Sequence, residues 1–125
     1  MKIREIVENI DQQELDQVER FADALWGKLG IDVEFTRHFM DRVNDERNGK
    51  PIGPAELIRL FKKEYEKNGK AISAINNSEA VMKDLLTSIN LPFVVKDTRQ
   101  GKQLVAKTVM RKPEFRTPDP EFVVK

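Results

Sequence analysis

The spacing of the apolar residues changes along this chain, and that change most constrains how it can fold. Up to about residue 70, apolar side chains recur at steps of three and four, as in Leu15, Val18 and Leu25, which is the spacing of one helical face. After residue 90, apolar and β-branched residues form short runs such as Phe93-Val94-Val95, which are typical of strands. The pattern predicts an α+β fold in which N-terminal helices pack on a small antiparallel sheet built from the C-terminal half.

Three helices are predicted, near residues 12–29, 36–48 and 54–68. Asp11 followed by Glu14 fits a capping box, and the Thr36 hydroxyl is a suitable N-cap for the second helix. Pro54 suits the first turn of the third helix, because its missing N–H would be unpaired there. Asn68-Gly69 is expected to end that helix, since both residue types tolerate the left-handed conformation.

The clearest predicted strands are residues 91–96 and 103–112. A polar, glycine-containing hairpin loop at 97–102 is expected to join them. Strict alternation along the second strand would place Lys107 and Arg111 on the same face of the sheet.

Other segments are less regular. Helical spacing favours one or two turns within residues 2–10, and alternation at 31–35 predicts a short strand or an extended segment. Residues 79–89 fit a helix or a strand, and a strand is weakly favoured. Three prolines make 113–125 a poor helix or strand, so we predict one α+β domain over 1–112 followed by an extended, proline-rich tail.

Composition excludes several classes of protein. The 125 residues include no cysteine and one histidine, which excludes a disulfide framework or a cysteine nucleophile and leaves too few ligands for a protein-only zinc site. We therefore expect no metal and no cofactor. No run approaches the roughly 20 apolar residues that cross a bilayer, and acids near the N-terminus argue against a signal peptide. The sequence thus predicts a soluble cytoplasmic protein without a membrane partner.

The segment 35–48 contains the histidine and mixes arginines with acids. His38 and Arg42 are four residues apart, so they lie above one another on one face of the predicted helix. A proton-transfer group beside a fixed cation suits chemistry on an anionic substrate. The alternative, which this segment alone favours, is a hydrogen-bonded histidine beside solvated ion pairs that contribute under about 1 kcal/mol each.

Charge is distributed unevenly along the chain, although the net charge is only +1. Residues 1–35 carry −5 and residues 99–116 carry +5. The basic segment predicts a surface that binds RNA or DNA phosphates, with a solvated face as the alternative. Its members are Arg99, Lys102, Lys107, Arg111, Lys112 and Arg116. The acidic N-terminal helix could bind a protein partner or mask the basic surface, although packing as structural support with its acids in water is favoured.

Three segments of the chain resemble uncharacterised proteins of tailed bacteriophages. They are His38-Phe39-Met40-Asp41-Arg42-Val43-Asn44-Asp45, Leu91-Pro92-Phe93-Val94 and Leu104-Val105-Ala106-Lys107-Thr108-Val109-Met110-Arg111-Lys112. The resemblance covers most of residues 31–117. It implies a phage origin but no particular activity.

A helix carrying His-x-x-x-Arg before a sheet that ends in a Lys/Thr/Arg strand also resembles the barnase–RelE superfamily of small ribonucleases. This resemblance implies metal-free cleavage, in which the RNA 2′-hydroxyl attacks the adjacent phosphate and cations stabilise the oxyanion. His38 would then be the general acid or base, and Thr108 would donate a hydrogen bond. The phosphate would be held by Arg42, Lys107 and Arg111. No motif defines a second proton-transfer group, for which Asp41 and Glu79 are candidates.

Two hypotheses about function follow. The first is a small phage-encoded, metal-independent ribonuclease that acts in the host cytoplasm. The second is a non-enzymatic phage protein, in the virion or in host takeover, that binds nucleic acid or a host protein. The His38–Arg42 pair favours the first hypothesis, the acidic N-terminal helix favours a protein partner, and the basic C-terminal segment agrees with both.

Overall fold

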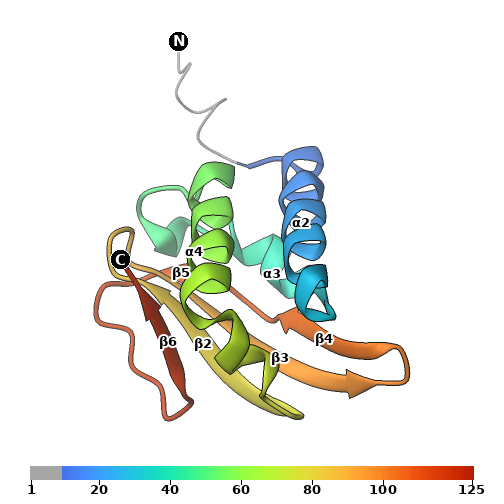
Figure 1. The fold of residues 1–125 in the computed structure, drawn as a ribbon. Coiled ribbons are helices and arrows are strands. Elements are labelled where there is room, and N and C mark those ends of the chain that lie inside the picture. Colours follow the sequence, from blue (N-terminus) through green and yellow to red (C-terminus); the bar gives the residue numbers. More distant parts are fainter. Residues whose placement is uncertain (1–9) are drawn as a thin grey trace.

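The computed structural model describes residues 10–125. Helices α2 and α4 lie side by side on one face of a six-stranded sheet, and in this view the short helix α3 appears between them (Figure 1). This arrangement confirms the predicted α+β class. The helical turns expected near residues 2–10 lie, but for Ile10, outside the described part of the chain.

The helical segments follow the predicted order. They are α2 at Gln12–Trp26, the 3₁₀ turn η1 at Gly27–Leu29, α3 at Arg37–Arg42, the 3₁₀ turn η2 at Glu46–Asn48, and α4 at Pro54–Ser73. Asp11 and Glu14 form the expected capping box, with the Asp11 carboxylate accepting from the Glu14 N–H at 2.8 Å. The prediction of one helix over 36–48 is wrong in its length, because Asp45 starts a separate turn by accepting a hydrogen bond from the Arg47 N–H.

Helix α4 does not stop at Asn68-Gly69, as predicted, but continues to Ser73. A Cβ atom at Gly69 would lie 3.0 Å from the Leu29 side chain. This is tighter than an ordinary contact, so glycine at 69 favours the close approach of α4 to the end of α2 and does not act as a helix stop. A glycine in a helical pattern cannot by itself distinguish these two uses.

The sheet contains β1 at Ile31–Phe35, β2 at Ser78–Asp84, β3 at Ile89–Thr98, β4 at Gly101–Ala106, β5 at Met110–Arg111 and β6 at Glu121–Val124. The strand order is β1-β4-β3-β2-β6, and β5 pairs with β3. The sheet is mixed, because the central strands β2, β3 and β4 pair antiparallel whereas β1 and β6 pair parallel with β4 and β2. The predicted strand within 79–89 is confirmed up to Asp84.

The expectation of a wholly antiparallel sheet from the C-terminal half fails at both edges. Residues 31–35 join the sheet as β1, with alternate side chains buried in the core. At the other edge, residues 121–124 form β6, so this part of the segment 113–125 does form a strand despite its neighbouring prolines. Both edge strands reach the sheet through crossovers from elsewhere in the chain, which local sequence patterns do not reveal.

The predicted strand 103–112 is broken into β4 and β5 by a β-bulge. Ala106 faces Phe93 and Met110 faces Asn90, so residues 107–109 lie opposite only Leu91 and Pro92. The Lys107 N–H donates to the Pro92 carbonyl at 2.9 Å, but Pro92 has no N–H to return. The extra residue ends the regular alternation, so the predicted common face of Lys107 and Arg111 is not formed.

Candidate functional site

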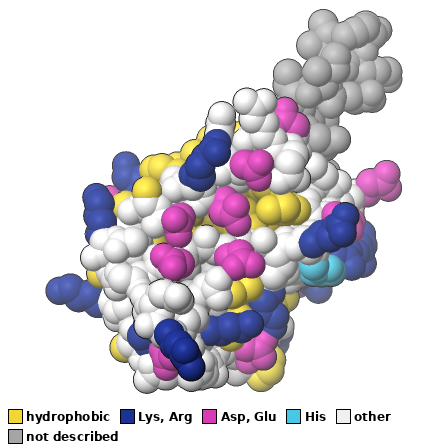
Figure 2. Space-filling model, turned by 90° about the vertical axis from the view of Figure 1, so that its right-hand side faces the viewer, with side chains coloured by type: hydrophobic (Ala, Val, Ile, Leu, Met, Phe, Trp, Pro, Cys, Tyr) yellow, Lys and Arg dark blue, Asp and Glu magenta, His cyan; other side chains and the backbone are white. Residues whose placement is uncertain are grey.

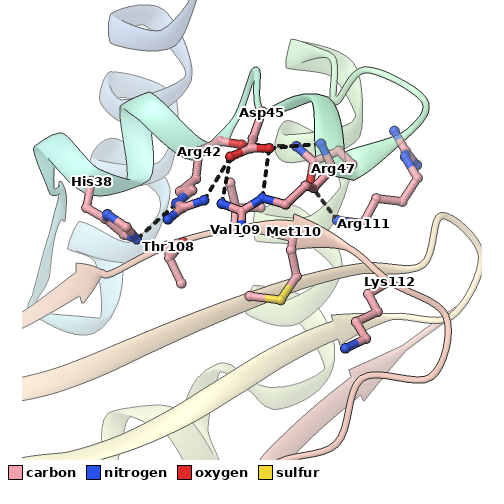
Figure 3. A pocket seen from close by; sticks show the side chains of 10 residues that line it. His38, Arg42, Asp45, Arg47, Thr108, Val109, Met110, Arg111 and Lys112 are labelled. Atoms are coloured by element: carbon pink, nitrogen blue, oxygen red, sulfur yellow. Dashed lines mark hydrogen bonds and ion pairs between the residues drawn. The ribbon is translucent and has the colours of Figure 1, made fainter.

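The side chains around one pocket include four of the five predicted catalytic residues. The pocket has a volume of about 580 Å³ and lies between α3–η2 and the bulge that precedes β5. Figure 3 shows its two walls, with Asp45 and Arg47 beyond the His38–Arg42 face and the strand residues opposite. The lining residues are His38, Arg42, Asp45, Arg47, Asn48, Thr108, Val109, Met110, Arg111 and Lys112.

Thr36 fixes the His38 wall against the bulge. Its hydroxyl oxygen accepts from the Phe39 N–H at 3.0 Å, which caps α3 as predicted, and donates to the Lys107 carbonyl at 2.9 Å. Pro92 cannot donate a hydrogen bond to this carbonyl, because it has no N–H. The single threonine hydroxyl therefore starts the helix that carries His38 and holds that helix beside Thr108.

His38 and Arg42 meet as their spacing predicts. The Arg42 Nε–H donates to His38 Nε2 at 3.4 Å (Figure 3). The ring nitrogen that faces Arg42 is therefore Nε2. The His38 ring is exposed to solvent, so a ligand in the pocket could reach it.

Asp45 holds two arginines at the pocket. Its carboxylate accepts from Arg42 Nη1 at 2.8 Å and from Arg47 Nη2 at 2.9 Å. One negative charge thus orients two positive charges, and the side chains of Arg42 and Arg47 remain 35% and 73% exposed. With Lys112 also in the lining, the pocket has a positive balance that suits an anionic group.

Arg111 lines the same pocket but is engaged in the fold. Its guanidinium donates to the backbone carbonyls of Lys50, Pro51 and Thr87 at 2.7 to 3.1 Å and forms two further bonds to Glu56. All five N–H donors of the side chain are used, and the side chain is only 11% exposed. Arg111 therefore has no donor left for a phosphate.

The Glu56 carboxylate is the anionic partner of this arginine. Burial opposes its ionisation, but hydrogen bonds from Arg111 and from the Gly53 N–H, with the positive charges of Arg111 and Lys50, lower the pKa of Glu56 below its ordinary value. Glu56 is consequently ionised at neutral pH. The Arg111–Glu56 pair joins β5 to the start of α4, and only its arginine lines the pocket.

Lys107 lies apart from the other predicted catalytic residues. The bulge directs it away from the pocket lining, and its ammonium pairs with the Glu79 carboxylate on β2. Glu79 is thus engaged elsewhere, and Asp41 is exposed outside the lining. Neither of the two candidates for a second proton-transfer group lies at the pocket.

The six predicted nucleic-acid-binding residues do not form one surface. Arg99 and Lys102 lie at the β3–β4 hairpin turn, roughly 25 Å along β3 from its pairing with β5, given about 3.3 Å per residue. Lys102 is engaged by Asp97 and Asn76. Arg116 lines a separate shallow hollow with Lys83, which leaves Lys112 as the one predicted member that faces the pocket without a described ion pair.

The acids of the N-terminal segment, as far as residues 10–35 are described, lie on another part of the surface than the pocket. Acidic side chains gather on the face that α2 and β1 present, whereas basic side chains lie around the histidine at its margin (Figure 2). Within residues 10–125, no acid of α2 forms an ion pair with the bases of 99–116. Helix α2 packs with Leu15, Val18, Ala22 and Trp26 in the core, as the structural alternative predicted. Its acids are not all in water alone, because Glu19 and Asp23 accept hydrogen bonds from β1.

Asp45, Arg47 and Asn48 were missed as site residues. The Asn48 amide donates to the Arg42 carbonyl at 3.0 Å, and its carbonyl oxygen accepts from the Arg111 N–H at 3.1 Å. Asn48 thereby joins the two walls. The only sequence signal was the position of Asp45 two residues before Arg47, a spacing at which an aspartate commonly caps a turn.

Two structural features and the comparison with known proteins complete the description of the site. Among residues 10–125, no three His, Cys, Asp or Glu side chains converge as a metal site would require. In the same part of the chain, no helix combines the length and apolar character needed to cross a membrane. Comparison with protein-family models, curated proteins and solved structures gave no match.

Proposed function

We propose that the pocket binds a phosphate of RNA and that His38 supplies proton transfer for metal-independent cleavage of the chain. The observation that carries this proposal is the convergence of His38 and Arg42 on α3 with Lys112 and Thr108 beyond the bulge. A base, cations and a hydroxyl around one opening are the groups that attack by a 2′-hydroxyl requires.

In this mechanism, His38 Nε2 exchanges its bond with Arg42 for one with the RNA 2′-hydroxyl and accepts that proton. The 2′-oxygen then attacks the neighbouring phosphorus, and the bond from phosphorus to the 5′-oxygen breaks. The imidazolium returns the proton to the leaving 5′-oxygen, which leaves a 2′,3′-cyclic phosphate and a 5′-hydroxyl. Arg42 and Lys112 stabilise the charge on the phosphorane oxygens, and Arg47 takes the phosphate-binding place expected of Arg111.

A non-enzymatic role in binding nucleic acid is the second candidate, and one feature of the lining supports it. His38 and Asp45 are the titratable acid–base groups there, and both Asp45 oxygens already accept hydrogen bonds from Arg47, with Arg42 on one of them. A site with one free proton-transfer group suits recognition of a phosphate as well as its cleavage. A phage protein of the virion or of host takeover would use the pocket in this way.

The test is incubation of the purified protein with single-stranded RNA and with the same sequence as 2′-deoxy oligonucleotide. Cleavage should be confined to RNA, should continue in a chelator, and should fall roughly 10²–10⁴-fold in His38→Ala. Arg99→Ala is the matched control, because it removes an exposed cation far from the pocket. Equal cleavage by wild type and His38→Ala would exclude this role for the histidine.

Binding is measured separately with uncleavable 2′-deoxy oligonucleotide at several salt concentrations. Arg42→Ala and Lys112→Ala should weaken binding and reduce its salt dependence, because fewer counterions are released. Salt-dependent binding without cleavage would support the second candidate. Absence of both binding and cleavage would contradict both.

A further inference from the structure

Strand β6 forms an outer edge of the sheet, and the N–H and C=O groups of its successive residues point alternately toward β2 and away from it. The Val81 N–H donates to the Pro120 carbonyl, and the Leu85 N–H donates to the Val124 carbonyl, each at 2.9 Å. In a parallel ladder, alternate residues direct both backbone groups to the neighbouring strand. Phe122 and Val124 therefore bond to β2, whereas the backbone groups of Glu121, Val123 and Lys125 point outward.

These outward groups have no partner among the described residues, whereas the opposite edge of the sheet is protected. At that edge, the Val33 N–H donates to the Asp23 carboxylate at 2.9 Å and the Phe35 N–H donates to the Glu19 carboxylate at 2.7 Å. Unpaired edge groups are a template for another strand. The β6 edge is thus open to pairing in a way that the β1 edge is not.

The segment before β6 does not occupy this edge. The Lys83 Nζ donates to the Phe115 carbonyl at 3.0 Å. Lys83 points away from the helical layer, because its neighbours Met82 and Asp84 are buried toward it. Phe115 therefore lies beneath the sheet, on the face opposite α4. No described residue of 113–119 forms a hydrogen bond with the outward backbone groups of β6.

We propose that β6 pairs antiparallel with β6 of a second copy of the chain, across a two-fold axis at Val123. A symmetric edge-to-edge contact must be antiparallel, because each strand presents the same edge to the other. In this register, Val123 faces Val123 of the second copy, and Glu121 faces Lys125 of the second copy. All three outward-facing residues then stand in hydrogen-bonded pairs.

Charge complementarity selects this register and this occupant. Glu121 and Lys125 are exposed, and Glu121 also pairs with Lys83 of its own chain at 3.3 Å. The two-fold axis adds two Glu–Lys pairs across the new ladder. Opposite charges directly across antiparallel strands are favourable, and like charges are unfavourable. With four residues in the strand, the contact is at the small end of specific interfaces, so the dimer forms reversibly with concentration.

The first experiment is sedimentation equilibrium of the full chain across protein concentrations. Lys125→Glu should weaken the dimer about tenfold, because both copies then place two acids opposite each other. Glu121→Lys should weaken it at least as much, because the new charge also opposes Lys83 of the same chain. The double variant Glu121→Lys/Lys125→Glu should restore most of the association. Lys28→Glu, an exposed change at the far edge of the sheet, is the control with the same change in net charge.

The second experiment locates the contact by amide hydrogen exchange in NMR. The Val123 N–H should exchange rapidly in dilute protein and become protected as concentration rises, while Phe122 and Val124 stay protected throughout. A chain that remains monomeric at millimolar concentration would overturn the proposal. A dimer whose stability does not change in the charge variants would also overturn it. The same holds if β6 pairs with a strand of another protein but not with a second copy of this chain.

Discussion

The two ends of the sheet use helical carboxyl groups in opposite ways. At the β1 end, Glu19 and Asp23 of α2 each accept a hydrogen bond from an outward backbone N–H of β1. At the other end, Glu64 of α4 is fully buried above β2, and only one of its oxygens has a partner, the Asn68 amide at 2.8 Å. Carboxyl groups on helices thus pair with the backbone of the β1 edge. Near the β6 edge, in contrast, a helical carboxyl is buried with one oxygen unpaired.

The difference shows that an acidic segment cannot be interpreted from its charge alone. The acids of α2 look like a solvated helix face or a mask for basic residues, but two of them serve as hydrogen-bond acceptors for a strand edge. Burial raises the pKa of Glu64 to about 8, although the Asn68 hydrogen bond and the Lys67 charge act in the other direction. The carboxylates at the β1 end thus bond to the strand edge, whereas the carboxyl beside β2 is protonated at neutral pH.

The largest expected effect concerns Glu64. Its folded-state pKa exceeds its unfolded value, so the folded protein retains the proton between about pH 4.5 and 8. The free energy of unfolding should fall across this window by up to about 1.4 kcal/mol per pH unit, and level off above it. Glu64→Gln should remove most of this slope in urea titrations at pH 5, 6, 7 and 8.

Glu66→Gln, an exposed change on the same helix, is the control and should keep the wild-type slope. Equal pH dependence in wild type and Glu64→Gln would mean that Glu64 ionises normally in the folded protein.

The next effect concerns the protected edge. Glu19→Ala combined with Asp23→Ala should lower the free energy of unfolding by roughly 2–4 kcal/mol, because two hydrogen bonds to charged acceptors are lost. The variant should also self-associate, since the β1 edge then resembles the open one. Denaturant unfolding and light scattering measure the two consequences.

Asp16→Ala is the matched control, because Asp16 lies on the same helix but bonds only to the Gln12 side chain among the described residues. Similar destabilisation by Asp16→Ala would indicate a general effect of charge on α2 and would contradict the capping role.

The smallest effect is expected at the open edge. Lys125→Glu should change the free energy of unfolding of the monomer by less than about 0.5 kcal/mol, because the side chain is exposed and has no described partner. Unfolding is measured at a concentration where the protein is monomeric. A substantial loss of stability would show that the Lys125 charge supports the fold, and would remove the contrast between the edges.

Several features were predictable because their causes are local. The capping box of Asp11 and Glu14 and the N-cap at Thr36 depend on side chains within three residues of the helix start. The meeting of His38 and Arg42 follows from helical spacing alone. Gly69 was misinterpreted because its reason, contact with Leu29, lies forty residues away in the chain.

By itself, the sequence determined the α+β class, the helix starts and the His38–Arg42 face, since each follows from residue spacing within one element. Only the tertiary structure decided which cations reach that face. Pro92 cannot complete the ladder, so the following bulge shifts the register, sends Lys107 to Glu79 and exposes Thr108 to the pocket. The partners of Arg111, at positions 50, 51, 56 and 87, occupy every donor of its guanidinium. Those contacts join segments distant in the chain, and no local pattern encodes them.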